Sequence, residues 1–461
     1  MKLDKLADAL RSFIPDPFVI AIGLTLIAAL AGVCNLALNG QADTSMTLVE
    51  SWVSGYRGSQ DSKVIGGLWT LLPFAMQMCL ILVTGYVVAS TGPVQRLVAR
   101  LAQIPRTTAQ AAALISVIAM GLALLNWGLG LIAGALLARE VGIAMQQRGI
   151  RVHYPLLAAA GYTGLAVWHG GFSGSAPLKV TDLQGLTEVL GPELAKQVGA
   201  LGLERTILSP RNLIVTGIVF CIVPICLALL VPRDPKTFIP APAPPQEDDS
   251  DTEPVTGFSG WLEWSPLFSL ALAGLMMLWI GPWAWNGGLL DLNPNSMNLC
   301  FLALGLVLAG SPARYMELAS RAASACGGII IQFPLYGGIL GLLAAGGGIS
   351  LLASVLPSTE WGLAAGTFLS AGLFNLFVPS GGGQWAVQGP IVMQAAVDGG
   401  MDPARILLAL SWGDQWTNLF QPFWALPLLG ITGTRAGDIL GYTMLLGVVT
   451  GVVFGLGAAI G

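Results

Sequence analysis

The sequence is poor in charged residues and in histidine. Of its 461 residues, 21 are Lys or Arg, 25 are Asp or Glu and 2 are His, while 54% are apolar. Soluble domains are about a quarter charged, so this composition excludes an ordinary soluble domain. The apolar residues recur in runs of about twenty, the length that a helix needs to cross a bilayer. The composition therefore predicts an all-α polytopic membrane protein in contact with lipid.

The chain also lacks a basic surface of the kind that binds nucleic acid. Its net charge of −4 arises within residues 233–258, where two basic residues accompany six acidic ones, and the other 19 basic and 19 acidic residues balance. We therefore expect no nucleic-acid partner. Because the segment 233–258 is rich in Pro and in acidic residues, we predict a disordered cytoplasmic linker.

Cysteine is scarce, and no CxxC pair or neighbouring His points to a metal site or a disulfide framework. We expect no cofactor, and the sequence leaves the metal content unknown. The six cysteines are predicted to be buried apolar side chains. They are Cys34, Cys79, Cys221, Cys226, Cys300 and Cys326.

The N-terminus lacks an apolar core followed by a small-residue cleavage site, so it does not look like a removable signal peptide. Apolar residues instead recur at helical spacing from Leu3 to Phe13, with basic residues around them. Residues 1–17 are therefore predicted to form a helix at the membrane interface.

Several apolar runs are long enough to cross about 30 Å of hydrocarbon. These predicted spans lie at 18–37, 67–90, 154–178, 211–232, 262–285, 297–311, 324–345, 405–430 and 439–460.

Two further apolar segments do not read as single spans. The first, 107–138, has Arg residues on both sides. Since basic loops stay in the cytoplasm, it must enter and leave on one side, as a re-entrant hairpin or as two short helices with Asn126 to Gly130 at the turn. The second, 361–398, has acidic flanks and is interrupted from Val378 to Trp385.

A cytoplasmic N-terminus places these two hairpins on opposite faces of the membrane. This arrangement leaves 14 Lys or Arg inside and 7 outside, the bias expected for cytoplasmic loops. Each hairpin follows a span with a polar centre, near Gln77 or Gln332, and precedes a span that is interrupted in its middle, at 168–177 or 414–422. The order of elements is the same in both halves and the orientation is opposite.

We therefore predict two inverted-topology repeats, each with a re-entrant hairpin and a broken transmembrane helix. The predicted domains are the N-terminal helix 1–17, the first transmembrane repeat 18–232, the linker 233–258 and the second inverted repeat 259–461.

The interruptions predict a binding site. Gly and Pro clusters within spans leave backbone groups without helical partners, at a cost of several kcal/mol each, and secondary transporters bind substrates at such paired breaks. Free N–H groups, hydroxyls and amides suit a small carboxylate, although glycine can instead serve close helix packing. The predicted substrate-binding residues are Asn126, Trp127, Gly128, Gly130, Ser173, Gly174, Ser175, Asn375, Ser380, Gly381, Gly382, Gly383, Gln384, Asn418, Gln421 and Pro422.

Two titratable residues inside spans are the candidates for a coupling ion. Asp414 could bind a cation or carry a proton, or it could instead cap a helix near the interface. His169 is the second candidate, with a hydrogen-bonded packing role as its alternative. An apolar pocket for an alkyl chain, or an interfacial belt, is predicted for the tryptophans Trp127, Trp168, Trp385, Trp416 and Trp424.

Several longer sequence motifs along the chain point to one family. They are IPDP at 14–17, FAMQM at 74–78, NWGLGL at 126–131, YPLL at 154–157, GGFSGS at 170–175, QFPLYGGI at 332–339, VPSGGGQWAVQGP at 378–390 and QPFWALP at 421–427. In these motifs the chain resembles the AtoE-type short-chain fatty acid transporters, over essentially its whole length except the linker.

The resemblance implies a secondary active carrier of the cytoplasmic (inner) membrane, which transports short-chain fatty acids such as butyrate or acetoacetate, and it leaves H⁺ or Na⁺ as the coupling ion. The layout is also similar to the wider ion-transporter superfamily, in which a scaffold domain holds a moving transport domain built from two hairpins and two broken helices. Many of those carriers are homodimers. The resemblance places the substrate at the hairpin tips and at the helix breaks.

Two other functions are compatible with the sequence at this point. Re-entrant hairpins also line channels for small anions. Residues 171–174 fit the GxSG string of rhomboid-type intramembrane serine proteases, with Ser173 as nucleophile, but the base would be His169, only four residues upstream on the same stretch. We expect the protein not to be an enzyme.

Overall fold

The structure is a computed structural model that describes residues 17–38, 44–57, 64–234, 236, 238–242, 257–288, 292–354, 356–376, 379–421 and 423–460. The predicted interfacial helix at 1–17 and the linker from 243 to 256 lie outside these residues, apart from Pro17.

The described chain is almost entirely helical, which confirms the predicted fold class. Two two-residue strands, β1 (Tyr56–Arg57) and β2 (Val64–Ile65), form a small antiparallel pair. Eight helical stretches of the described residues are long and apolar enough to cross a membrane. The protein is therefore a multi-pass membrane protein.

In residues 17–242 the helices are α2 (Pro17–Leu38), α3 (Thr44–Ser54), α4 (Leu72–Ala89), α5 (Gly92–Leu101), α6 (Thr108–Leu125), α7 (Trp127–Gln147), α8 (Tyr154–Tyr162), α9 (Ser175–Lys179), α10 (Leu183–Leu190), α11 (Pro192–Val198) and α12 (Pro210–Leu229). The 3₁₀ turns η1 (Thr163–Ala166), η2 (Trp168–Gly170) and η3 (Leu203–Arg205) interrupt them. The predicted span 154–178 is thus a broken helix, made of α8, η1, η2 and α9.

In residues 257–460 the helices are α13 (Phe258–Trp264), α14 (Pro266–Trp285), α15 (Pro294–Ala309), α16 (Pro312–Ala323), α17 (Gly327–Ala345), α18 (Gly348–Ser354), α19 (Glu360–Asn375), α20 (Gly381–Asp398), α21 (Pro403–Thr417), α22 (Leu426–Thr432) and α23 (Ala436–Ala459). The 3₁₀ turns are η6 (Ser324–Cys326), η7 (Asn418–Phe420) and η8 (Phe423–Ala425). The predicted span 405–430 is the second broken helix, made of α21, η7, η8 and α22.

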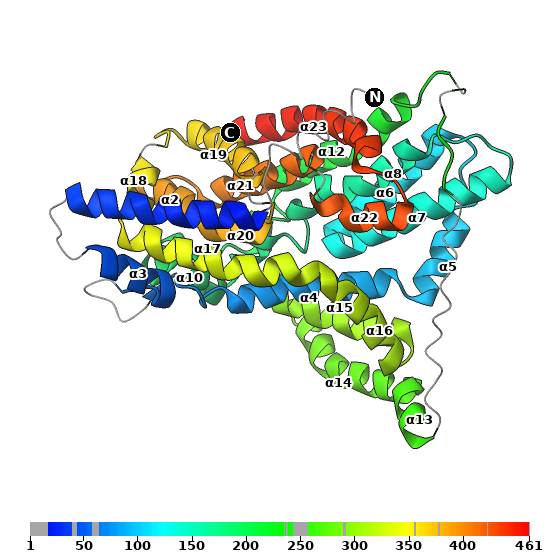
Figure 1. Ribbon diagram of the computed structural model, residues 1–461, viewed down its shortest axis with the longest axis horizontal. Coiled ribbons are helices and arrows are strands. Elements are labelled where there is room, and N and C mark those ends of the chain that lie inside the picture. The colour runs from blue at the N-terminus through cyan, green and yellow to red at the C-terminus, as the bar shows by residue number, and fades with distance from the viewer. Residues whose placement is uncertain are drawn as a thin grey trace.

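The two hairpins approach the middle of the molecule from opposite ends (Figure 1). Helices α5 to α8 and α22 lie toward one end, which we call the linker end, and α3, α10, α18 and α19 lie toward the other, which we call the α10 end. Helices α4 and α17 run lengthwise between them, and α13 to α16 project from the side of the body. This arrangement supports the predicted inverted repeats, which stay a prediction.

Each hairpin turns at a polar residue that caps its second arm. The side chain of Asn126 accepts a hydrogen bond from the N–H of Leu129 at 2.9 Å, which caps α7. The Ser380 hydroxyl accepts one from the N–H of Gly383 at 3.2 Å, which caps α20. Such caps satisfy N–H groups that a helix start leaves free, so each turn has a partner for one of these groups.

Two predictions outside the hairpins are wrong. Cys34 and Cys221 are exposed on the outer surface of the bundle, because they lie on faces of α2 and α12 that lipid can cover. The linker is not disordered throughout, because its start packs on the linker end of the bundle. The N–H of Tyr154 donates to the carbonyl of Ile239 at 2.8 Å, and the side chain of Gln146 donates to the carbonyl of Ala241 at 3.3 Å.

Candidate functional site

The tip of the first hairpin contacts the first helix break. The N–H of Trp127 donates a hydrogen bond of 2.8 Å to the Ser173 hydroxyl, and the Asn126 amide donates one of 3.2 Å to the carbonyl of Ile81 on α4. Asn126 and Ser173 are both fully buried. These two side chains therefore satisfy backbone groups that the turn and the break would otherwise leave without partners.

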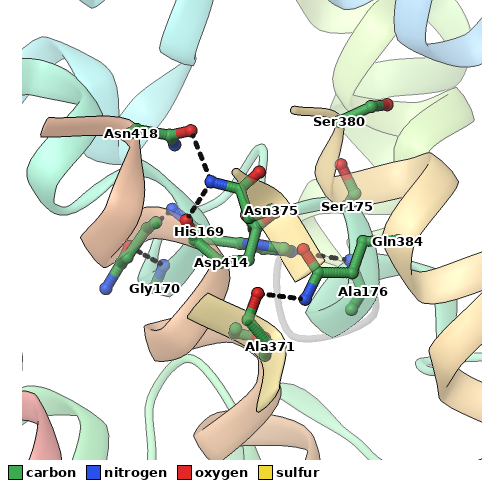
Figure 2. Close-up of polar contacts among 12 residues, drawn as sticks. His169, Gly170, Ser175, Ala176, Ala371, Asn375, Ser380, Gln384, Asp414 and Asn418 are labelled. Atoms are coloured by element: carbon green, nitrogen blue, oxygen red, sulfur yellow. Dashed lines mark hydrogen bonds and ion pairs between the residues drawn. The ribbon is translucent and has the colours of Figure 1, made fainter. Parts of the chain in front are cut away.

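The base of the second hairpin turn contacts the second helix break in the same manner. The amide nitrogen of Asn375, the last residue of α19, lies 2.8 Å from the carbonyl of Asp414, 2.9 Å from the Thr417 hydroxyl and 3.0 Å from the Asn418 side-chain oxygen. Gln421 returns a bond of 3.1 Å to the carbonyl of Asn375. Figure 2 shows Asn375 between Asp414 and Asn418. This amide fastens the hairpin to the broken helix.

A third contact joins the two breaks to each other. The hydroxyl of Tyr162, at the end of α8, lies 3.1 Å from the carbonyl of Asn418 and 3.3 Å from the carbonyl of Gln421. Tyr162 is buried. The broken helices of the two halves are therefore held together at the centre of the molecule.

A small cavity lies where the tips and breaks converge. Its volume of about 30 Å³ has room for about two water molecules. It is lined by hydroxyl, amide, apolar and indole groups from both halves, namely Met78, Trp127, Leu165, Trp168, Ser175, Ile329, Ser380, Gly381, Gly382, Asn418 and Trp424. Part of the predicted substrate set thus shares one cavity, although a short-chain acid would need it to widen.

The tip of the second hairpin lies against aromatic rings of α4 and α17. A Cβ atom on Gly382 would lie 2.9 Å from Phe333 Cζ and 3.2 Å from Phe74 Cζ, and one on Gly383 would lie 2.3 Å from Tyr336 Cε2. Phe74 and Phe333 pack edge to face at 5.5 Å between ring centroids. The glycines are therefore required because rings come so close to the hairpin backbone.

Other predicted residues support the tips without lining the cavity. Gly128, Gly130 and Gly174 allow close backbone approach, since a Cβ on each would lie 3.1 Å from Leu82 O, 2.5 Å from Ala123 Cβ and 2.3 Å from His169 O, respectively. The Gln384 amide donates to the carbonyl of Ala371 at 3.0 Å and so ties the two hairpin arms together. Pro422 lies outside the described residues.

The tryptophans divide into two groups. Trp127 lies 6.1 Å from Trp168 and 5.1 Å from Trp424 between ring centroids, and all three line the cavity. Trp385 is fully buried within the bundle, and Trp416 stacks on Phe368 at 5.0 Å. Neither of these last two is among the cavity-lining residues, so the predicted indole wall consists of the first three.

Asp414 and His169 form a buried pair. His169 Nδ1 lies 2.6 Å from Asp414 Oδ2, and both side chains are essentially inaccessible to solvent. Asp414 lies near the end of α21, and the N-cap of that helix is Asp402, so the alternative that Asp414 is an interfacial cap is wrong. His169 comes from η2 in the other half of the chain, and Figure 2 shows it beside Asp414.

The hydrogen bonds assign the protons of this pair. The N–H of Ala176 donates to His169 Nε2 at 3.1 Å, so Nε2 must be the unprotonated nitrogen and Nδ1 carries the hydrogen that is donated to Asp414. Gln415 accepts from the N–H groups of His169 and Gly170 at 2.9 and 3.3 Å. Among the described residues, Asp414 Oδ1 has no hydrogen-bond partner.

These contacts remove the protease alternative. Both ring nitrogens of His169 are bonded, to Asp414 and to Ala176, and the Ser173 hydroxyl accepts from Trp127. Ser173 and His169 therefore do not form the nucleophile and base pair that serine hydrolysis requires.

Lys179 was not predicted from the sequence. It is 3% exposed, its ammonium forms an ion pair with Glu188, donates to Gln77 Oε1 at 3.3 Å, and lies 4.8 Å from the Phe74 ring centroid. It stands one helical turn after Ser175, which contacts Met78. The sequence does not indicate that this Lys is buried and paired, because its partners Gln77 and Glu188 lie in other helices.

A larger apolar cavity lies away from the tips. Its volume is about 450 Å³, and its lining comes from α2, α17, α18 and the hairpin arms α19 and α20. Apart from Asn35, Ser370 and Gln388, its walls are apolar residues and glycine, so it lacks the set of donors that a carboxylate needs.

Two hairpins whose tips meet two broken helices at a central cavity are an arrangement found in membrane transporters. The chain belongs to the short-chain fatty acid transporter family, because the sequence profile of that family matches residues 3–460. The protein is accordingly a transporter and not an enzyme.

Two curated relatives agree with this assignment, and two solved structures have a similar fold. Relatives from Escherichia coli (strain K12) and Haemophilus influenzae (strain ATCC 51907 / DSM 11121 / KW20 / Rd), both provisionally named short-chain fatty acid transporters, are 33% and 32% identical, each over 96% of both chains. The YdaH transporter of Alcanivorax borkumensis has a TM-score of 0.53 at 15% identity, over 96% of this chain and 98% of that one. MtrF of Neisseria gonorrhoeae, described as an antimetabolite efflux pump, has a TM-score of 0.55 at 16% identity, over 100% and 98%. The two structures share the fold.

Proposed function

We propose that the protein is a secondary active transporter that moves short-chain monocarboxylates of the butyrate or acetoacetate type across the cytoplasmic membrane, coupled to H⁺ or Na⁺. The observation that carries the proposal is the central cavity, where hydroxyls, an amide and three indoles from both halves converge. The names of the family and of the curated relatives support the substrate class. The N-terminus is proposed to be cytoplasmic and the assembly a homodimer.

The cavity offers separate surfaces for the two ends of such a substrate. Ser175 and Ser380 supply hydroxyl donors and Asn418 an amide. The start of the 18-residue helix α20 at Gly381 and Gly382 adds backbone N–H groups and the positive end of the helix dipole. Trp127, Trp168 and Trp424 face the alkyl chain. A carboxylate bound here exchanges its water for fixed donors, and its short tail is removed from water.

We further propose alternating access, in which the hairpins and broken helices move together against α4 and α17. The bonds of Asn375 and Tyr162 join these elements into one unit. The tip of the second hairpin contacts α4 and α17 through ring edges on glycine, whereas the first hairpin is bonded to α4 by the Asn126 amide, a bond that the movement would have to release. The two predicted inverted repeats give such a unit equivalent routes to either side.

Counterflow in proteoliposomes tests this function. Vesicles loaded with unlabelled acetoacetate, at equal pH on both sides, should take up labelled acetoacetate at least tenfold faster than unloaded vesicles. The reason is that a carrier reorients with substrate bound on each side. Protein-free vesicles give the passive leak of the acid.

The channel alternative predicts a different result. A channel for small anions would give uptake that loading does not accelerate, together with a current in a planar bilayer. An absence of protein-dependent acetoacetate and butyrate movement in either format would contradict the proposed substrate class.

A further inference from the structure

We propose that the coupling ion is a proton carried on Oδ1 of Asp414, and that His169 is the positioning residue which holds this carboxylate. The inference rests on the proposed function, since a coupling site has meaning only in a transporter. It selects one of the two ions that the proposed function leaves open and names the atom that binds it.

The hydrogen bonds of the pair leave one basic atom. Asp414 Oδ2 accepts the Nδ1 hydrogen of His169 at 2.6 Å, and His169 Nε2 accepts the N–H of Ala176 at 3.1 Å. Neither ring nitrogen has a lone pair free for another proton. Oδ1 of Asp414 is fully buried and has no partner among the described residues, and a buried carboxylate oxygen without a donor is costly unless it binds a cation.

The occupied oxygens at the second break favour a proton over a metal cation. Hard cations need several oxygen ligands, and transporters commonly supply them from unwound helix ends. Here the amide nitrogen of Asn375 lies 2.8 to 3.0 Å from the carbonyl of Asp414, the Thr417 hydroxyl and the Asn418 side-chain oxygen, and its two hydrogens can bond two of these oxygens at a time. A donor group fills the place where a cation would gather ligands, whereas a proton needs only Oδ1.

A protonated Oδ1 would have a candidate acceptor on a residue that already contacts this stretch of α21. The amide nitrogen of Asn375 lies 2.8 Å from the carbonyl of Asp414, and Figure 2 shows the two residues together. Asn375 Oδ1 is a buried oxygen without a partner among the described residues. The proton would convert two oxygens without donors into one donor and one candidate acceptor. The same site therefore satisfies hydrogen bonding better when it is neutral.

Other titratable groups on the elements packed around α21 are engaged elsewhere or lie toward an end of the bundle. Lys179 bonds Glu188 and Gln77, and Tyr162 bonds the second break. Arg405 stands about 14 Å along α21 from Asp414, by helix rise. The remaining groups are Arg211 on α12, Glu360 on α19, Asp398 on α20, Asp402 before α21, and Asp438 and Tyr442 on α23. Of the described residues, His169 is the titratable group in contact with the Asp414 carboxylate.

Only a thin wall separates this carboxylate from the substrate cavity. A Cβ atom on Gly381 would lie 2.7 Å from Trp168 Cη2, 2.8 Å from His169 Cε1 and 3.1 Å from Asp414 Oδ2. Gly381 and Trp168 both line the cavity, and Trp168 stacks on His169 with 4.4 Å between ring centroids. A carboxylate bound in the cavity would therefore feel the charge of Asp414 across a glycine and an indole.

This proximity couples the two ligands. Like charges disfavour each other at short range, so a bound substrate anion strengthens proton binding at Asp414, and a bound proton strengthens substrate binding by the same factor. Couplings of this kind are typically about 5- to 150-fold. In the transport step Oδ1 takes a proton from water on one side, the substrate anion binds, and both leave on the other side with Oδ1 ionised again.

The test compares gradient-driven uptake with counterflow in the same vesicles. Labelled acetoacetate is the probe, because its keto group slows the passive leak of the protonated acid, and protein-free vesicles are the baseline. Three conditions are applied at zero membrane potential: counterflow at equal pH, a pH gradient without sodium, and a sodium gradient at equal pH. Wild type should show counterflow and accumulation with the pH gradient, and should not respond to the sodium gradient.

Asp414→Asn is the decisive variant, because Asn copies the shape of a protonated Asp and keeps an acceptor for His169. Its ratio of pH-driven uptake to counterflow should fall at least tenfold. Asp398→Asn, which removes an exposed carboxylate at the far end of α20, should keep the wild-type ratio. A wild-type ratio in Asp414→Asn, or wild-type uptake driven by sodium alone, overturns the proton assignment. A lack of wild-type counterflow instead overturns the proposed function.

Two further measurements keep the proposal testable if that variant does not insert. Unbuffered purified wild type should take up about one proton per acetoacetate bound, as a pH-indicator dye reports, and the absence of proton uptake contradicts the site. His169→Leu should move the pH midpoint of transport upward, because the carboxylate loses its donor. His169→Asn, which keeps a donor near the Nδ1 position, should restore the midpoint. A purely structural His169 would change the rate and leave the midpoint in place.

Discussion

At the scale of single residues, the central site depends on side chains that satisfy backbone groups and on glycines that admit rings. Asn126, Ser173 and Asn375 each bond the backbone of a turn or a break. Gly382 and Gly383 leave room for the rings of α4 and α17. The helices at the site are thus interrupted while most of their buried polar groups keep hydrogen-bond partners. Among the described residues, Asp414 Oδ1 and Asn375 Oδ1 lack one.

Gly383→Ala should damage the second hairpin. The new methyl would lie 2.3 Å from Cε2 of the fully buried Tyr336, and overpacking of this kind costs about 1 to 3 kcal/mol. Counterflow should fall at least tenfold, and the Tm of the detergent-solubilised protein should fall by several degrees. Gly366→Ala on α19 is the control, because its methyl meets Pro357 at an ordinary 3.6 Å. Equal behaviour of the two variants would show that the ring contact does not position the hairpin.

Residue roles were predictable from the sequence only where the signal is local. The Ser-Gly-Gly-Gly and Asn-Trp-Gly strings mark turns in apolar surroundings, so the hairpin tips could be located. The pairing of His169 with Asp414 spans 245 residues, and no local pattern encodes it. Lys179 was missed for the same reason, because it contacts Gln77 and Phe74 of α4, and Gln77 lies 102 residues earlier in the chain.

At the scale of elements, the start of the linker is fastened to the body by His153. Its Nδ1 accepts the N–H of Ile239 at 3.3 Å, and its Nε2 lies 2.9 Å from the Tyr442 hydroxyl. Burial lowers the pKa of His153 from its ordinary value of 6.5, so the docked segment requires the neutral ring. Residues 238–242 are therefore joined to the bundle by a contact that acid can break.

This contact should weaken as the pH falls. A histidine with a lowered pKa in the docked state takes up a proton more readily when the segment is released, so docking is strongest above about pH 6.5 and is lost below it. Hydrogen exchange at Ile239, corrected for the intrinsic rate, should be faster relative to α8 at pH 5 than at pH 7.5. His153→Gln should remove this pH dependence. An unchanged relative rate in wild type would contradict this role of His153.

The hairpins and breaks were predictable as elements because Gly and Pro strings interrupt otherwise continuous apolar runs. Their bounds were less predictable, because the ends of the hairpin arms depend on capping side chains and on packing against neighbouring helices. The linker shows the limit most clearly: its composition predicted disorder, whereas Ile239 and Ala241 bond Tyr154 and Gln146. Composition describes the average of a segment and cannot report that a few of its residues have partners.

At the scale of the whole molecule, a unit of hairpins and broken helices is proposed to move against α4 and α17. Ser175 and Met78 lie on opposite sides of that boundary, with the hydroxyl 3.3 Å from the sulfur. Ser370 and Gln388 lie within the moving hairpin, 2.9 Å apart at their polar ends. Cross-links at these two pairs can distinguish movement of the unit against α4 from movement within the unit.

Cross-linking should distinguish them. The test uses a background without the six native cysteines. Oxidation of the Met78→Cys and Ser175→Cys pair should lower the counterflow rate at least tenfold, because α9 can no longer shift along α4. A reductant should restore the rate. The Ser370→Cys and Gln388→Cys pair is the control and should leave most counterflow intact when oxidised. Full transport by the cross-linked first pair would contradict relative movement of these bodies.

The central cavity of about 30 Å³ also bears on how tightly the membrane is sealed. It holds about two waters, whereas a file of water across about 30 Å of hydrocarbon would need about ten. At this point of the molecule there is too little water to relay ions or protons while no substrate moves. A cell could therefore hold many copies of the transporter and still keep the ion gradients that are proposed to drive it, because leakage through this point would require the cavity to open.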